Sequence, residues 1–306
     1  MKHFLWIALS LFLMGQGLSA QQNLQERLGY AKDAKLLIVH ADDLGVIHGV
    51  NQASFKAMQN GSVSSASIMV PTPWLPEVAK YAKANPDHDM GIHLTLTSEW
   101  QLLRWGPVAP RSQVSSLVDS NGYFYPDCNT LWENAKIEEV EIELRAQIEK
   151  AIAMGIKPTH LDSHMGCLFS TDPRYYQLYV QLADEYGIPA MVNHQIEQLG
   201  GTETAEPPVV IDQIFGAGTE DFDKDAMGKY YADALRALEP GVHVMIIHCG
   251  YDNMESQGMS FEHPYWGAKW RQDDYDFFSS EECARILEEE NIHVITWKEI
   301  GRLLKK

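Results

Sequence analysis

Short apolar runs alternate with amphipathic segments along most of the chain. The apolar runs end in turns or polar residues, as buried strands do, and they lie at 36–40, 65–70, 90–97, 158–164, 188–193, 209–214, 242–248 and 292–296. Segments with helical spacing or helix end signals separate them, at 21–32, 49–60, 76–85, 137–154, 175–186, 224–238 and 279–290. This alternation predicts a parallel sheet whose strands are joined by helical crossovers.

The number of short strands favours a closed or nearly closed barrel over an open sheet. We therefore expect an α/β fold of the TIM-like (β/α) barrel type, distorted or incomplete. Barrels as long as this 306-residue chain commonly fold as one unit, so residues 21–306 should form a single domain. No internal repeat and no glycine-rich phosphate motif is visible in the sequence, which argues against a dinucleotide-binding fold.

The first twenty residues have the features of a signal peptide. Lys2 and His3 precede an apolar run at 4–14, and small residues at 18–20 mark a cleavage site. A retained membrane anchor is the alternative, but the run is too short to cross a bilayer as a helix. We expect residues 1–20 to be removed and the protein to be exported, periplasmic or secreted, with no stable membrane anchor.

The net charge and the cysteine spacing exclude some classes of partner and metal site. A net charge of −18 repels polyanions at long range, so nucleic acid is not an expected partner. A neutral or amino-bearing sugar would not be repelled. The four cysteines contain no CxxC pair, which argues against a zinc ribbon. Export would permit a disulfide, but the sequence does not pair the cysteines. The sequence also does not decide whether the protein forms a homodimer.

A long connection at 98–135 is rich in aromatic residues: Trp100, Trp105, Tyr123, Phe124, Tyr125 and Trp132. Connections of this length without regular structure are usually functional. Sugars commonly lie against aromatic faces, so the connection could form the substrate side of a site. Aromatic side chains that simply pack on the body of the protein are an equally good explanation.

Titratable residues collect where the predicted strands end: Asp42, Asp43, His93, His160, Asp162, His164 and His248. In parallel α/β barrels the active site forms at the carboxyl ends of the strands. Each group alone has a structural explanation, such as a helix cap for the aspartate pair. Their joint position at strand ends favours one common site.

The period of a strand refines this expectation. His160, Asp162 and His164 would share one face, and burying them is costly unless they are paired or bind a cation. Two imidazoles and a carboxylate are a common ligand set for zinc and related divalent ions. The adjacent Asp42 and Asp43 should point in different directions, so one can bind a metal while the other accepts a proton.

Six segments match, in order, the motifs of one family. They are LLIVHADDLG at 36–45, GVNQA at 49–53, SSASIMV at 64–70, GIHLTLT at 91–97, KPTHLDSHMG at 157–166 and VMIIHCGYD at 244–252. The chain thus resembles the YdjC-like carbohydrate deacetylases, the group that contains chitooligosaccharide deacetylase. The resemblance implies a barrel related to polysaccharide deacetylases.

The resemblance also implies roles for single residues. Asp43, His93 and His164 would bind one divalent metal ion, zinc or magnesium. Asp42 looks like the general base, and His248 looks like the general acid or a group that polarises the substrate. Further residues would lie near the ligands or the substrate: His160, Asp162, Arg271, which resembles an arginine preceding the family's last helix, and Asn51. Three departures leave the substrate open. Residues 165–167 lack the further histidines of many relatives, Cys249 replaces the usual proline, and many relatives lack an export signal.

The function expected is metal-dependent removal of acetyl groups from N-acetylated amino sugars or oligosaccharides. Another metal-dependent amide or ester hydrolase is an alternative. A glycosidase would need two carboxylates, such as Asp42 and Asp162, and would leave the histidines without a role. A non-catalytic sugar-binding protein should have lost the base or a ligand, and neither is missing. The sugar, the choice between N- and O-acetyl groups and the metal remain open.

Overall fold

The computed structural model describes residues 22–169, 172–199 and 209–304, so the predicted signal peptide at 1–20 lies outside the described residues. Within this part, seven parallel strands form one sheet in the order β4-β3-β2-β1-β6-β5, and β7 pairs with the start of β1. The strands are β1 (Lys35–Leu44), β2 (Ser65–Ile68), β3 (Asp89–Leu94), β4 (Leu161–Ser163), β5 (Gln213–Phe215), β6 (Gly241–Ile247) and β7 (Ile292–Val294).

The sheet curls into a distorted barrel, as expected from the sequence. Single parallel bridges, Leu161 to Ala190 and Asn193 to Ile211, continue the pairing from β4 towards β5. The strand predicted at 188–193 is therefore wrong, since it contains only isolated bridges, and the strand predicted at 209–214 is shifted, since β5 is Gln213–Phe215. Pro189 offers one physical reason, because proline has no N–H to donate to a ladder.

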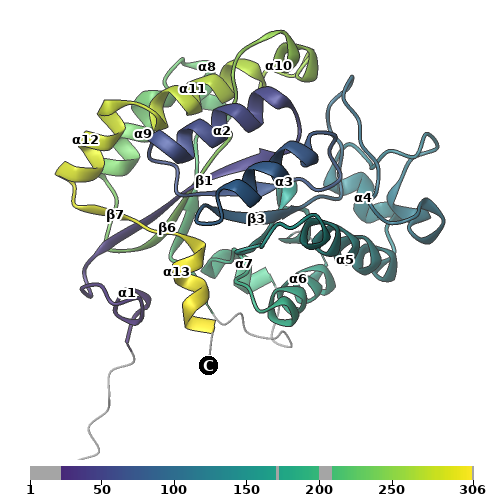
Figure 1. The fold of residues 1–306 in the computed structure, drawn as a ribbon, viewed down its shortest axis with the longest axis horizontal. Helices are drawn as coiled ribbons and strands as arrows, with labels where there is room; N and C mark the ends of the chain where they lie inside the picture. Colours follow the sequence, from purple (N-terminus) through teal and green to yellow (C-terminus); the bar gives the residue numbers. More distant parts are fainter. Residues whose placement is uncertain (1–21, 170–171, 200–208, 305–306) are drawn as a thin grey trace, which may run out of the picture.

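Helices surround the curled sheet. In the view of Figure 1, α2, α9, α11 and α12 lie above the strands, and α5 and α6 lie below them. The helices are α1 (Leu24–Arg27), α2 (His48–Asn60), α3 (Leu75–Ala84), α4 (Cys128–Asn134), α5 (Ile137–Ala153), α6 (Pro173–Tyr186), α7 (His194–Leu199), α8 (Thr219–Asp223), α9 (Met227–Arg236), α10 (Met254–Met259), α11 (Ala268–Phe278), α12 (Glu281–Glu289) and α13 (Trp297–Gly301). No helix in the described ranges is long and apolar enough to span a bilayer.

The structure shortens one predicted helix and contains a helix, α11, that the sequence pattern did not predict. The helix expected at 21–32 is only the short α1, and Gly29 follows it with a positive φ of 91°. Helix α11 was not predicted, because its buried face includes the polar residues Arg271 and Asp274 as well as Trp270 and aromatic positions near its end. A buried arginine and aspartate on that face hide the apolar periodicity that indicates a helix.

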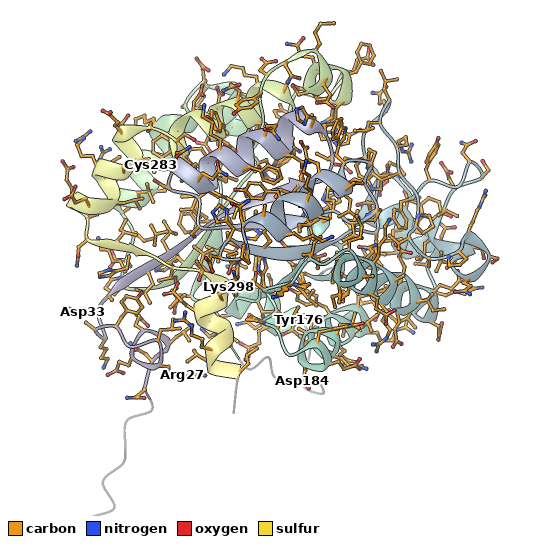
Figure 2. All side chains as sticks on the ribbon, viewed as in Figure 1. Arg27, Asp33, Tyr176, Asp184, Cys283 and Lys298 are labelled. Carbon is orange, nitrogen blue, oxygen red and sulfur yellow. A yellow bond between two sulfur atoms is a disulfide. The ribbon has the colours of Figure 1, made fainter. Side chains whose placement is uncertain are left out.

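The inner face of β1 changes character along the strand. Leu36 and Ile38 belong to an apolar cluster with Trp297 of α13, whereas His40 and Asp42 follow at the same period of two. Lys298, also on α13 (Figure 2), donates its backbone N–H to Asp89 and its ammonium group to two carbonyl oxygens ahead of β3. Helix α13 thus closes the amino-terminal end of the barrel, where buried Asp89 is held by Lys298, and the inner face of β1 becomes polar towards its carboxyl end.

Candidate active site

A bulge at the end of β1 brings both aspartates into one site. The register with β2 shifts between Ala41 and Leu44, and Asp43 has a φ of 70°. Such left-handed backbone costs of order 1–3 kcal/mol and is concentrated at functional sites. Asp43 Oδ1 lies 3.4 Å and Asp42 Oδ2 lies 3.9 Å from His93 Nε2. Simple strand alternation would have separated the two carboxylates, and the bulge explains why it does not.

Asn51 supports the turn that follows this bulge. Its Oδ1 accepts a hydrogen bond of 2.7 Å from the backbone N–H of Gly45, and its Nδ2 donates to Glu77. Gly45 has a φ of 102°, and a Cβ there would lie 2.8 Å from Thr72 Oγ1, so glycine is required. Asn51 therefore fixes the turn after Asp43, and none of its recorded bonds goes to the other predicted site residues.

Three ligand atoms converge at the centre of the site. Asp43 Oδ1 lies 3.4 Å from His93 Nε2 and 3.4 Å from His164 Nδ1, and the two nitrogen atoms are 3.2 Å apart. Tetrahedral ligands at about 2.0–2.1 Å from zinc lie roughly 3.3–3.4 Å from one another. Asp43 Oδ1 is also buried with no hydrogen-bond partner. The three residues that the family resemblance implies as ligands are therefore placed so that they could hold a divalent metal ion.

The electrostatics of the trio favour a cation. Burial lowers the pKa of His164, but Glu99 and Asp43 outweigh burial and raise that pKa to about 9. Burial opposes ionisation of Asp43, yet Arg271, His164 and His93 hold the pKa of its carboxyl well below the usual range. His164 thus keeps a proton, and Asp43 stays ionised, where a cation would bind, and the same negative field would stabilise a metal ion.

Two carboxylates orient the histidines from behind. Asp162 Oδ1 lies 2.8 Å from His93 Nδ1, and Glu99 Oε2 lies 3.0 Å from His164 Nε2. Metal-binding histidines usually make such a bond through the ring nitrogen that faces away from the metal. The sequence placed Asp162 near the ligands but did not reveal Glu99, which comes from the long 98–135 connection and carries no local signal.

His160 does not join the metal-binding trio. Its Nδ1 bonds to Thr159 Oγ1 at 3.0 Å, and its ring stacks on Trp297 with centroids 5.2 Å apart. Gly91 makes room for it, because a Cβ there would lie 2.3 Å from His160 Nε2. Of the face formed by His160, Asp162 and His164, only His164 joins the trio, while Asp162 is paired with His93 and His40.

Asp42 keeps one carboxylate oxygen free. Its Oδ1 lies 2.9 Å from His40 Nε2 and accepts a bond of 3.1 Å from Ser67 Oγ, while Oδ2 faces His93 and His248. Burial lowers the pKa of His40, but hydrogen bonds to Asp162 and Asp42 outweigh burial and raise it to about 9. Sequence reasoning missed His40, although its spacing of two from Asp42 was a usable signal.

His248 and Arg271 complete the site from β6 and α11. His248 Nε2 lies 4.0 Å from Asp42 Oδ2, and burial, with a smaller effect from Arg271, lowers the pKa of His248 to about 4. Arg271 Nη2 donates to Asp43 Oδ2 at 2.6 Å, and its Nε donates to the Trp266 carbonyl at 2.6 Å. Arg271 thus holds the Asp43 oxygen that faces away from the trio.

The 98–135 connection covers this part of the molecule with packed aromatic side chains. Trp100, Trp105 and Phe124 are buried, so packing explains these three, whereas Tyr123 is 40% exposed. A disulfide between Cys128 and Cys167 ties the connection to the segment after His164. The pairing could not be derived from the sequence, because it joins two segments that meet only in the fold.

Comparisons with known proteins agree with the resemblance. The sequence model of a family described as YdjC-like protein matches residues 36–289. A Thermus thermophilus protein named carbohydrate deacetylase is 33% identical over 294 residues, which cover 92% of this chain and 99% of the relative. A Brevibacillus brevis protein of the same name is 31% identical over 277 residues, covering 87% and 99%.

One solved structure supports the fold. It is an Enterococcus faecalis protein described as a candidate cellobiose-phosphate cleavage protein, and it superposes with a TM-score of 0.73 at 24% identity. The match covers 87% of this chain and 99% of that chain. At this identity the likeness establishes a shared fold and nothing about the substrate.

Proposed function

Since the chain belongs to the YdjC-like protein family, we propose that it is a metal-dependent deacetylase acting on N-acetylated amino sugars or oligosaccharides. The relatives named carbohydrate deacetylase support the reaction class. One observation carries the proposal. Three ligand atoms lie 3.2–3.4 Å apart, and a fourth group, Asp42, stands beside them with a free carboxylate oxygen.

In this proposal Asp43, His93 and His164 hold the ion. When bound, a divalent ion polarises the acetyl carbonyl and lowers the pKa of a water molecule. Asp42 Oδ2 takes a proton from the attacking water, because its other oxygen is already bonded to His40 and Ser67. His40 thereby keeps the accepting oxygen aimed into the site.

His248 then returns a proton to the leaving nitrogen. With a pKa of about 4, its imidazole is neutral in the resting site and must first gain a proton. Asp42 holds the proton just taken from water and lies 4.0 Å away. We infer that the proton passes from Asp42 through His248 to the amine as the C–N bond breaks. The products are acetate and the free amino sugar.

The alternatives are less well supported by the geometry. Both oxygens of Asp162 are engaged, by His93 and by His40, so Asp162 is not free to act as the second carboxylate of a glycosidase. A sugar-binding protein without activity would have no need for the base. Another metal-dependent amide or ester hydrolase differs from the proposal only in its substrate.

The test is acetate release from a panel of N-acetylated and O-acetylated sugars, with and without a chelator. The proposal expects release from at least one N-acetylated amino sugar, loss of activity after chelation and recovery on adding a divalent metal. Activity that survives complete metal removal would contradict it. Release from O-acetylated sugars alone would replace the amide substrate with an ester.

We also propose that the protein is exported and works outside the cytoplasm. The support is the charged start, apolar run and small residues of 1–20. Mass spectrometry of the native protein should find a chain that begins after residue 20. A native chain that still begins at Met1 would contradict export by this route.

A further inference from the structure

An apolar pocket adjoins His248. It has a volume of about 240 Å³ and lies among β5, β6 and α11. Its lining includes Phe215, Tyr231, Ile246, His248, Trp266 and Trp270. His248 is the member of this lining that also faces Asp42, so the pocket opens next to the reacting centre.

Trp266, which forms one wall of the pocket, has a strained backbone conformation. Trp266 has a φ of 53°, a conformation that a bulky side chain rarely adopts, and its ring is 39% exposed. The ring stacks on buried Trp270 with centroids 5.1 Å apart, and Trp270 stacks on Phe222 at 5.2 Å. Strained residues persist where the surrounding structure over-determines them, and they cluster at ligand sites.

Arg271 ties this wall to the metal-binding trio. One end of its guanidinium group donates to the Trp266 carbonyl and the other end to Asp43, each at 2.6 Å. Arg271 is 1% exposed, so it cannot shift towards solvent. The position of the Trp266 backbone is therefore coupled directly to a carboxylate of the reacting centre.

We propose that the Trp266 pocket is a subsite that binds one pyranose ring of the substrate. This proposal rests on the deacetylase function proposed above. The volume is below the range of about 300–1,000 Å³ typical of sites for drug-sized ligands, which suits a single ring. The negative face of an aromatic ring attracts the weakly positive C–H groups of a sugar. His248 lines the pocket and also faces Asp42, so a ring seated there would lie next to an acetamido group at the trio.

The test measures binding of N,N′-diacetylchitobiose by calorimetry to the metal-loaded Asp42→Asn protein, in which turnover should be slowed about 10²–10⁴-fold. Adding Trp266→Gly should weaken binding about three- to tenfold, the range expected for loss of one aromatic contact. Glycine accepts the positive φ without strain, so this change preserves the fold. Trp266→Phe should retain part of the affinity.

Trp74 gives a matched control. It is 38% exposed, like Trp266, but it lies beside His48 with ring centroids 5.0 Å apart and lines a different pocket. Trp74→Ala should leave the affinity unchanged. In the otherwise native enzyme, Trp266→Gly should raise KM more than it lowers kcat.

Two results would overturn the subsite, and they have different meanings. Equal sugar affinity with and without Trp266→Gly removes the subsite but leaves the deacetylase proposal intact. No sugar binding to the Asp42→Asn protein, together with no acetate release by the native enzyme, overturns both proposals.

Discussion

The two sides of the carboxyl end of the barrel are lined by different kinds of side chain. On the side of β1, β3 and β4, buried carboxylates and imidazoles form a continuous polar network around the metal-binding trio. On the side of β5, β6 and α11, aromatic and aliphatic side chains enclose a pocket in which Tyr231 already bonds to Asp274. The first side is suited to chemistry and the second to recognising an apolar ring face.

This difference predicts which property of the site each side controls. Charged groups on the polar side restrain one another, so removing one should change metal binding or turnover. The apolar side contributes contact area, so a change there should affect affinity for the sugar. His248 lies at the boundary between the two sides and belongs to both.

The largest effects should come from the paired aspartates. Asp43→Asn should abolish metal binding and turnover together, because it removes an anionic ligand whose Oδ1 has no hydrogen-bond partner. Asp42→Asn should retain the metal and lose about 10²–10⁴-fold in kcat, the usual contribution of a positioned base. Metal analysis and acetate release on both variants measure this. Metal loss in the Asp42 variant alone would reverse the two roles.

Removing the disulfide should destabilise the polar side. The double variant Cys128→Ala and Cys167→Ala opens a link between residues 39 apart, and loop-closure entropy predicts a loss of about 2–4 kcal/mol in the free energy of unfolding. Denaturant unfolding measures the loss. The Cys283→Ala variant controls for removing a buried free thiol elsewhere. Unchanged stability in the double variant would show that the packed aromatics alone hold the connection.

Glu99→Gln should weaken the metal site without emptying it. Its carboxylate bonds to His164 Nε2 at 3.0 Å, and loss of such a partner typically costs about 10–100-fold in metal affinity. Competition with a chelator of known affinity measures the change. Glu133→Gln, at an exposed position of the same connection, should have no effect. An equal effect of both changes would reject an orienting role for Glu99.

Metal affinity should also rise with pH. Without metal, His164 keeps its proton up to about pH 9, because Glu99 and Asp43 outweigh burial. Burial lowers the pKa of His93, but Asp162 and Asp42 outweigh burial and raise that pKa well above its usual value. The ion must displace both protons, so affinity should increase by up to about a hundredfold per pH unit while both imidazoles are protonated, and level off above their pKa values. Metal titrations between pH 6 and 8 measure the slope. An affinity independent of pH would mean that no protonated histidine is displaced.

The sequence predicted the polar side far better than the apolar side, and the reason is physical. Asp42, Asp43, His93 and His164 follow strands whose apolar runs can be recognised locally, and parallel strands bring their ends together. Arg271 could be singled out only by resemblance, because the periodicity of α11 is broken by its own buried charges. His40 was within reach from its spacing of two from Asp42.

Other features depend on contacts between distant segments. Glu99, the Cys128–Cys167 pair and the Trp266 pocket each join parts of the chain that no local pattern relates. The weak arc between β4 and β5 was overpredicted as strands for the same reason. An apolar run indicates that a segment is buried, but it does not indicate which neighbouring strand will form backbone hydrogen bonds with that segment.

Anomalous diffraction from crystals grown with zinc tests the central claim most directly. The described residues contain other candidate groupings, including His40 with His160 and Asp162, so the position of the ion is decisive. The account predicts one peak about 2.0–2.2 Å from Asp43 Oδ1, His93 Nε2 and His164 Nδ1. A peak between His40, His160 and Asp162, or no peak near Asp43, would contradict it.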